Sequence, residues 1–379
     1  MNFTLTPKQQ MLKNFFREFA KKEVEPLAAK IDESEEFPWS TVKKMAKLGI
    51  MGIPFPKEYG GAGGDTLSYT IAVEEISRAC AATGIILAAH VSTACHPIYQ
   101  FGNEEQKQKY LKPMAQGQLL GAIALTEPNA GSDASNQQTT AELDRDAYVI
   151  NGTKMFITNG GVADVYIVFA VTNRSKGLKG ISAFIVEKGL PGFSFGIKEN
   201  KMGIRASSTT ELIFQECRIP KENLLGKEGE GFYIAMQSLN GGRIGIGAQA
   251  LGIAQAALDE SIRYSKERYQ FKRRIGDFQA IQWMLADMAT EIDAARFLVY
   301  RAAYLKDQKK PFGKESAMAK LYASEVAMKS TVKAVQIHGG YGYMKEYKVE
   351  RLMRDAKITQ IYEGTSEIQR MIISESLLK

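Results

Sequence analysis

The sequence predicts an α+β protein of several domains in which helices predominate. Three observations indicate this: helical periodicity through residues 1–118, short β-rich segments through 119–228, and long helical patterns through 229–379. The β segments follow one another without a long helix between them, which is typical of an antiparallel barrel or sandwich. The last part has long helices with short connections, which favours a helical bundle. A length of 379 residues fits two or three domains at about 150 residues each.

The first helix of the N-terminal domain has a clear start signal. Thr6 followed by Pro7 is a favourable helix start, and apolar residues then recur at helical spacing. We expect this helix to end near Pro26, and the glycines of YGGAGGD at 59–65 to close the next element.

A stretch without acidic or basic side chains, from Ala79 to Asn103, raises the question of a membrane span. It is interrupted by glycine, proline, serine and histidine, and its apolar runs are shorter than the ~18 residues that a span needs. We therefore expect a buried helix and no membrane association. The beginning, MNFTLTPKQQ, lacks the pattern of a signal peptide, so a cytoplasmic location is expected.

Seven segments of the middle region are predicted to form strands. Asn151-Gly152 and Asn159-Gly160 are predicted to be turns between them. The segments are LLGAIAL, AYVI, KMFIT, VYIVFAV, GISAFIV, FSF and TELIFQECRI.

Charge and cysteine content exclude few classes of function. The net charge of +7 permits nucleic acid, a membrane surface or phosphorylated ligands as partners and does not choose among them. The basic clusters at 272–274 and 306–310 are short and lack interleaved aromatic residues, so we interpret them as solvated surface. Three separated cysteines fit neither a disulfide framework nor a zinc site, and three scattered histidines give no metal spacing.

Two polar segments of the middle region have both a structural and a functional interpretation. GAIALTEPNAGSDAS at 121–135 is either a strand-ending turn or a loop whose Thr126 and Ser132 donate hydrogen bonds to a planar ligand. In KMFITNGG, Phe156 and Thr158 share one face of a strand, which suits a stacked flat ring or a core position. QIHGGYGY at 336–343 is a weak glycine pattern by itself.

Glu363 lies between a helix-forming run and Gly364, in DAKITQIYEGTSEIQR at 355–370. Ser366 and Gln369 have the spacing of a capping box, which predicts a short terminal helix. Free N–H groups at its start would attract an anion. Alternatively, Glu363 and Glu367 are only polar residues at a helix end and have no role in chemistry. Hydrolase and metalloenzyme interpretations have no support, because there is no Ser-His-Asp order with an elbow motif.

Six motifs together resemble those of the acyl-CoA dehydrogenase family, over nearly the whole chain. They are LTEPNAGSD, FITNGG, LNGGR, ERYQF, QIHGGYGY and MRDAKITQIYEGTSEIQR. The resemblance is strongest to the short-chain, butyryl-CoA members. It implies a helical domain, a β-barrel and a four-helix bundle. It also implies FAD as cofactor, a homotetramer, and an electron-transfer flavoprotein as electron acceptor.

The resemblance assigns roles to individual residues. Glu363 is the expected base that removes the α-proton of an acyl-CoA thioester before a β-hydride passes to flavin N5. The expected FAD contacts are Ile123, Leu125, Thr126, Gly131, Ser132, Phe156, Ile157 and Thr158. Further FAD contacts, the first six across a subunit boundary or in the adjoining loop, are Arg268, Phe271, Gln279, Gln336, Gly339, Gly340, Thr365, Ser366 and Glu367. The expected substrate contacts are Ser132, Asn240, Gly241, Arg243 and Gly364.

Three departures from the family pattern affect these expectations. Phe156 stands where many relatives have tryptophan, Asn240 replaces a common aspartate, and FKRRI at 271–275 lacks the usual glycine and proline. Relatives acting on isovaleryl or long-chain substrates carry their base near the position of Gly242, so a straight-chain substrate is expected. The absence of arginine between residues 79 and 103 disfavours a glutaryl substrate.

The expected reaction is therefore the FAD-dependent conversion of butyryl-CoA to crotonyl-CoA. A branched- or medium-chain acyl-CoA dehydrogenase and a nucleic-acid-binding flavoprotein of the same fold are the alternatives. An acyl-CoA oxidase usually has a much longer chain.

Overall fold

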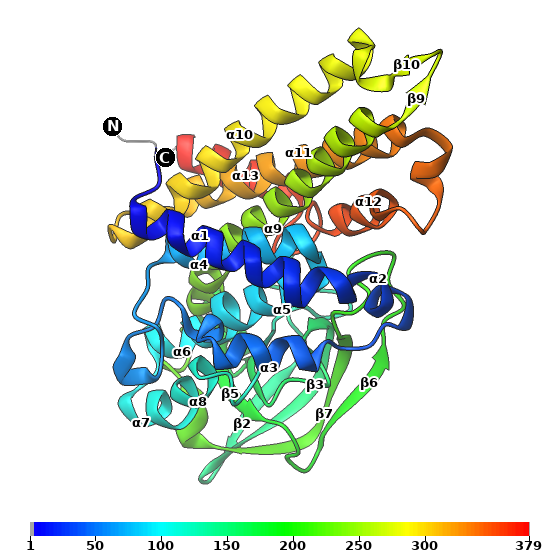
Figure 1. Cartoon of the computed structure of the whole chain (residues 1–379). Helices are drawn as coiled ribbons and strands as arrows, with labels where there is room; N and C mark the ends of the chain where they lie inside the picture. Colours follow the sequence, from blue (N-terminus) through cyan, green and yellow to red (C-terminus); the bar gives the residue numbers. More distant parts are fainter. Residues whose placement is uncertain (1–3, 379) are drawn as a thin grey trace.

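The structure is a computed structural model that describes residues 4–378. In Figure 1 the strands of the middle region occupy the lower part and the long C-terminal helices the upper part. Helices α4 (Thr66–Ala79) and α5 (Ala81–Ala88) of the N-terminal region pack against α9 (Gly231–Glu267) of the C-terminal region. The π-helical segment after α5 packs against strand β1 (Gly121–Ala124). Three parts of the chain that are distant in sequence therefore meet near the centre of the molecule.

The N-terminal region is helical, as predicted. Its helices are α1 (Pro7–Phe19), α2 (Glu25–Ser34), α3 (Trp39–Lys47), α4 (Thr66–Ala79), α5 (Ala81–Ala88), α6 (His96–Phe101), α7 (Glu104–Gln106) and α8 (Lys112–Ala115). Thr6 caps α1 and forms a capping box with Gln9, which confirms the predicted start. The predicted end at Pro26 is wrong. The chain passes through a π-helical turn (Ala20–Val24) into α2, where Pro26 lies in the first turn and its missing N–H costs little.

The chargeless stretch is a buried helix, as predicted. Residues Ala81–Phe101 form a helix that passes through a π-helical segment, Ala89–Cys95, between α5 and α6. Its length and hydropathy would allow it to cross a membrane, but 94% of the window that meets these criteria is buried inside the protein. It is therefore a core helix.

The middle region is one eight-stranded sheet. Its strands are β1 (Gly121–Ala124), β2 (Thr140–Asp144), β3 (Ala147–Thr158), β4 (Val165–Val171), β5 (Ile181–Glu187), β6 (Phe193–Lys198), β7 (Thr209–Pro220) and β8 (Leu224–Leu225). They pair in the order β6-β7-β3-β2-β4-β5-β8, with β1 beside β4. Most of the strand pairs are antiparallel, as predicted, but β4 pairs in parallel with β1 and, at one position, with β2. The β2–β3 hairpin lies between β1 and β4 in the sequence, so the chain can return before β4 and run parallel to β1.

The turn predicted at Asn151-Gly152 is also wrong. Both residues lie inside β3, where a β-bulge separates the pairs made by Ile150 and Gly152. Gly152 has φ 143° and a Cβ there would come within 2.8 Å of three atoms of Thr139, so glycine is needed for close packing rather than for a turn. The turn at Asn159-Gly160 is confirmed: it follows the last residue of β3, and Asn159 has φ 63°. The short strands β2 and β8 were not predicted.

The C-terminal region is a helical bundle, as predicted. Its helices are α9 (Gly231–Glu267), α10 (Gln279–Asp307), α11 (Gly313–His338), α12 (Lys348–Ile358) and α13 (Ser366–Leu378). The three long helices pack together, and α12 and α13 pack on α11. A small hairpin of β9 (Tyr269–Gln270) and β10 (Arg273–Arg274) projects from the far end of α9 and α10 (Figure 1).

Candidate active site

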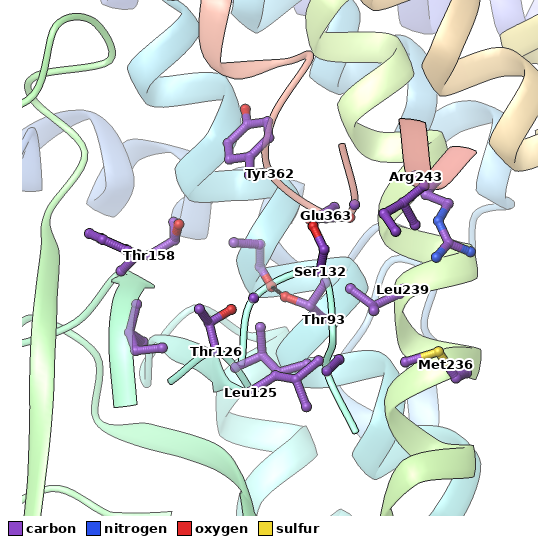
Figure 2. A pocket seen from close by; sticks show the side chains of 18 of the residues that line it. Thr93, Leu125, Thr126, Ser132, Thr158, Met236, Leu239, Arg243, Tyr362 and Glu363 are labelled. Atoms are coloured by element: carbon purple, nitrogen blue, oxygen red, sulfur yellow. Dashed lines mark hydrogen bonds between the residues drawn. The ribbon is translucent and has the colours of Figure 1, made fainter. Parts of the chain in front are cut away.

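A cavity of about 350 Å³ lies where the three regions meet. Figure 2 shows the Glu363 side chain directed into it above Ser132, with Thr126 and Thr158 on one side and Met236 and Leu239 of α9 on the other. Its lining comprises Ile85, Ala89, Thr93, Ile123, Leu125, Thr126, Gly131, Ser132, Asp133, Ala134, Ser135, Phe156, Ile157, Thr158, Phe232, Met236, Leu239, Arg243, Tyr362, Glu363, Gly364, Ile368 and Ile372. The cavity therefore has a hydroxyl-bearing wall facing an apolar one.

Glu363 stands in the turn between α12 and α13. Glu363 has φ 52° and Gly364 has φ 92°, so two successive residues adopt the left-handed conformation. This conformation is unfavourable for a glutamate and sharply redirects the chain. The Oε2 atom of Glu363 is buried and has no hydrogen-bond partner among the described residues. A buried, unpaired carboxylate oxygen that lines a cavity is available to a ligand.

The helix after this turn begins at Ser366, as predicted, but its cap is different. The hydroxyl of Thr365, rather than that of Ser366, accepts a hydrogen bond from the backbone N–H of Ile368. The Gln369 side chain donates to the carbonyl oxygens of Glu363 and Gly364. The predicted capping box is wrong because the helix starts one residue earlier than its spacing assumed, and Gln369 instead fixes the turn.

The electrostatic environment suits a proton acceptor that works near neutral pH. Burial raises the pKa of Glu363 to about 7, and the positive charges of Arg243 and Lys320 oppose this rise. Arg243 is itself buried, and its Nη1 donates to Oδ1 of Asn240 over 2.6 Å. Asn240 therefore still supplies a hydrogen-bond acceptor at the position where the family resemblance implies an aspartate.

The hydroxyl-bearing wall is held in place by a buried ion pair. Nζ of Lys154, which is fully buried, donates to Oε1 of Glu127 over 2.7 Å and to Oε1 of Gln137 over 3.1 Å. Glu127 also accepts the backbone N–H groups of Gln138 and Thr139. These contacts join the two ends of the loop that carries Thr126 and Ser132. Sequence analysis missed Lys154, although a lysine within an apolar strand pattern was the available signal.

Phe156 and Thr158 both line the cavity, as their spacing suggested, but the strand between them is irregular. The pairing of β3 with β7 shifts between Lys154 and Ile157, and Phe156 has φ 58° within this bulge. Phe156 is 58% exposed. An aromatic residue that is both strained and exposed at a cavity edge indicates a role toward a ligand rather than in the core.

Eleven predicted site residues do not line this cavity. Thr365, Ser366 and Glu367 lie in or next to the first turn of α13, and Asn240 and Gly241 lie on α9 beside Arg243. The remaining residues gather at the far end of the bundle, where the guanidinium of Arg268 lies 5.3 Å from the ring centre of Tyr341. These residues are Arg268, Phe271, Gln279, Gln336, Gly339 and Gly340. The altered FKRRI segment forms the turn and the second strand of the β9–β10 hairpin, with Phe271 and Lys272 at positive φ.

The lining fits a flavin ring and an acyl thioester side by side. Thr126, Ser132 and Thr158 offer hydroxyl groups to a flat polar ring, and Phe156 offers an aromatic surface next to them. The unpaired Oε2 of Glu363 and the apolar face of α9 suit a thioester whose acyl chain is uncharged.

Comparisons with known proteins identify the family. Three family models match in order: acyl-CoA dehydrogenase N-terminal domain (residues 6–118), middle domain (122–217) and C-terminal domain (229–378). The chain belongs to the acyl-CoA dehydrogenase family. The acyl-CoA dehydrogenases are FAD-dependent enzymes, so the predicted enzyme class and cofactor are confirmed.

Individual relatives are similar over their full lengths. The short-chain specific acyl-CoA dehydrogenase of Clostridium acetobutylicum is 60% identical over 379 residues, which are 100% of both chains. The structure of butyryl-CoA dehydrogenase from Megasphaera elsdenii matches this acyl-CoA dehydrogenase with a TM-score of 0.98 at 53% identity, covering 100% of both chains. A chain from a structure described as the electron transferring flavoprotein of Acidaminococcus fermentans matches with a TM-score of 0.99 at 58% identity, again covering 100% of both.

Proposed function

We propose that this acyl-CoA dehydrogenase converts butyryl-CoA to crotonyl-CoA, with Glu363 as the base. The observation that carries the proposal is the carboxylate of Glu363, which lines the cavity and whose buried Oε2 has no hydrogen-bond partner among the described residues. Short-chain specificity is supported by the relatives that act on short acyl-CoA substrates.

Glu363 removes a proton from the α-carbon of the bound thioester. An α-proton next to a thioester is weakly acidic, so the base must be close, correctly aligned and only weakly solvated. The raised pKa of Glu363, about 7, makes its conjugate acid a better match to the carbon acid than an ordinary carboxyl group would be. Bound FAD accepts the β-hydride.

The chain holds the cofactor with the residues that form the hydroxyl-bearing wall. These are Ile123, Leu125, Thr126, Gly131, Ser132, Phe156, Ile157 and Thr158, all of which line the cavity. We assign Thr365, Ser366 and Glu367 to the ADP part of the cofactor. Arg268, Phe271, Gln279, Gln336, Gly339 and Gly340 are assigned to the FAD of a neighbouring subunit in a homotetramer.

The acyl chain packs on the apolar wall. That wall is built from Ile85, Ala89, Phe232, Met236 and Leu239, and Thr93 lines the cavity beside them. Substrate contacts near the thioester are assigned to Ser132, Asn240, Gly241, Arg243 and Gly364. Because none of the apolar side chains carries a charge, an acyl chain with an uncharged end fits best.

The protein's partners and organisation complete the proposal. An electron-transfer flavoprotein is the proposed electron acceptor, supported by the related chain from the Acidaminococcus fermentans structure. We place the enzyme in the cytoplasm and its domain boundaries at 1–118, 119–228 and 229–379.

Anaerobic mixing of the purified yellow protein with butyryl-, hexanoyl-, octanoyl- and dodecanoyl-CoA tests the proposed substrate. We expect the flavin absorbance to bleach fastest with butyryl-CoA and progressively more slowly with longer chains. Faster bleaching with octanoyl-CoA would assign a medium-chain substrate, and no bleaching with any of the four would refute the reaction.

A further inference from the structure

The turn that carries Glu363 needs support from outside itself. Glu363 and Gly364 both have positive φ, at 52° and 92°. A non-glycine residue in the left-handed region costs about 1–2 kcal/mol, and such strain persists only where surrounding contacts fix it. The question is which contacts keep this carboxylate aimed into the cavity.

Two side chains from different helices meet on one carbonyl of the turn. Nζ of Lys320, on α11, donates to the carbonyl oxygen of Gly364 over 2.6 Å. Nε2 of Gln369, on α13, donates to the same oxygen over 2.8 Å and to the carbonyl oxygen of Glu363 over 3.2 Å. Both side chains are fully buried. The turn is thus tied to two helices by its backbone, which leaves the Glu363 carboxylate free.

A buried lysine at position 320 would lower the stability of the fold if its only role were packing. An ammonium group has three donors, and among the described residues Lys320 has one hydrogen-bond acceptor, the carbonyl oxygen of Gly364. Burial lowers the pKa of Lys320 to about 8. A buried charge with incomplete hydrogen bonding is often less stable than an apolar side chain of similar size. Lys320 contacts the residue that follows Glu363, and its charge favours the ionised form of Glu363, which suggests a role in the site.

We propose that Lys320 is a positioning residue for the catalytic base: it fixes the carbonyl of Gly364 and thereby holds the carboxylate of Glu363 toward the substrate. This inference rests on the proposed function, because it takes Glu363 as the base. Lys320 itself touches neither the substrate nor the reacting atoms.

Lys320 is one of several charged or titratable groups that act on the turn. Arg243 of α9 and Lys320 of α11 both favour the ionised form of Glu363. Burial raises the pKa values of Tyr69 on α4 and Tyr362 in the turn, and the negative charge of Glu363 raises them further. The negative charges of Glu325 and Glu367 favour the protonated form of Lys320 and so oppose the lowering of its pKa by burial. Removing the Lys320 charge leaves Arg243 as the main cation, so the pKa of Glu363 rises further.

The experiment separates the donor from the charge with three variants. Lys320→Met removes both, Lys320→Gln keeps a donor without charge, and Lys320→Arg keeps the charge. Lys329→Met is the control, since Lys329 lies on the same helix with a mostly exposed side chain. Each FAD-loaded variant is mixed in deuterated water with an acyl-CoA whose β-methylene is replaced by sulfur. This ligand has α-protons but no β-hydride to lose, so NMR measures proton removal alone.

We expect α-proton exchange to fall about 10²-fold in Lys320→Met, the size expected when a reacting group is misplaced by about 1 Å. The acid limb of the exchange rate against pH should move to higher pH in the Met and Gln variants and stay near its wild-type position in Lys320→Arg. Lys329→Met should match the wild type. If Lys320→Met does not fold, the positions of the acid limb in Lys320→Gln and Lys320→Arg carry the test.

Wild-type exchange with an unmoved acid limb in FAD-loaded Lys320→Met or Lys320→Gln would overturn the inference, even if the melting temperature fell. Glu363→Gln is measured alongside. If exchange persists in Glu363→Gln, the assigned base is wrong and the proposed function fails. If exchange is lost in Glu363→Gln but unchanged when Lys320 is replaced, only the role of Lys320 fails.

Discussion

Gly242 of α9 lies directly against the carboxylate of Glu363. A Cβ atom on residue 242 would be 2.0 Å from Oε2 and 2.8 Å from Cδ of Glu363. No van der Waals contact is that short, so residue 242 can have a side chain only if Glu363 moves. The space next to Cα of residue 242 can hold either the carboxylate of Glu363 or a side chain on residue 242, but not both. Glycine at position 242 is therefore consistent with residue 363 supplying the base.

Gly242→Ala should displace Glu363 without affecting the wall that holds FAD. We expect the yellow protein to form normally while its rate of bleaching with butyryl-CoA falls by about 10²-fold. Gly313→Ala is the matched control, because a Cβ on Gly313 meets Asn240 atoms only at 3.5 Å and beyond. Equal activity in both variants would show that the carboxylate can move without loss.

Asn240→Asp should change the pH dependence. Oδ1 of Asn240 accepts from Arg243, and an aspartate there would pair with that cation and offset its charge. Arg243 lowers the pKa of Glu363, so its neutralisation should raise that pKa. The base must be ionised to work, and kcat/KM, which we expect to rise with pH through about 7 in the wild type, should rise at higher pH in the variant. If the rise of kcat/KM with pH occurs at the wild-type pH or at lower pH in Asn240→Asp, the proposed effect of Arg243 on Glu363 is wrong.

The ion pair between Lys154 and Glu127 should control both stability and FAD retention. Removing one partner of a buried pair typically costs about 3–5 kcal/mol because the other charge is left unpaired. We expect Lys154→Met and Glu127→Gln each to lower the denaturation midpoint and weaken FAD rebinding to the apoprotein. The double variant should recover part of the stability. Fully additive losses in this double-mutant cycle would show that the two side chains do not act together.

Leu239 should limit the length of the acyl chain. It lines the apolar wall of the cavity together with Met236, one turn away on α9. Replacing Leu239 by alanine removes three carbon atoms and lengthens the available space, so kcat/KM for octanoyl-CoA relative to butyryl-CoA should increase. Ala89 also lines this wall, and Ala89→Leu is the opposite change, which should reduce that ratio. An unchanged ratio in both variants would place the end of the acyl chain elsewhere.

The sequence predicted elements that depend on local patterns. The strand VYIVFAV is β4 from Val165 to Val171, and the cap at Thr6 is present with its capping box. Local patterns failed where tertiary contacts override them. Asn151-Gly152 is a favourable turn dipeptide, but pairing with β7 and close packing on Thr139 keep it inside a strand. Pro26 is tolerated because a π-helical turn precedes it.

The candidate site was predicted in part, for a similar reason. Glu363 and the hydroxyls of Thr126 and Ser132 belong to recognisable motifs, and the structure brings them to one cavity. Lys320 belongs to no motif, and Lys154 begins the segment KMFITNGG without any role that its spacing indicates. Their roles come from contacts with Gly364, 44 residues away, and with Glu127, 27 residues away, which periodicity in the sequence does not encode.

The central claim is that the carboxylate of Glu363 removes the α-proton, and anaerobic mixing of Glu363→Gln with butyryl-CoA tests it most directly. The substitution keeps the shape of the side chain and removes its basicity, and a positioned base contributes about 10²- to 10⁴-fold to the rate. We predict that Glu363→Gln binds FAD, stays yellow and bleaches at least about 10²-fold more slowly than the wild type, while Glu375→Gln on the exposed face of α13 bleaches normally. Bleaching of Glu363→Gln at the wild-type rate would contradict the account.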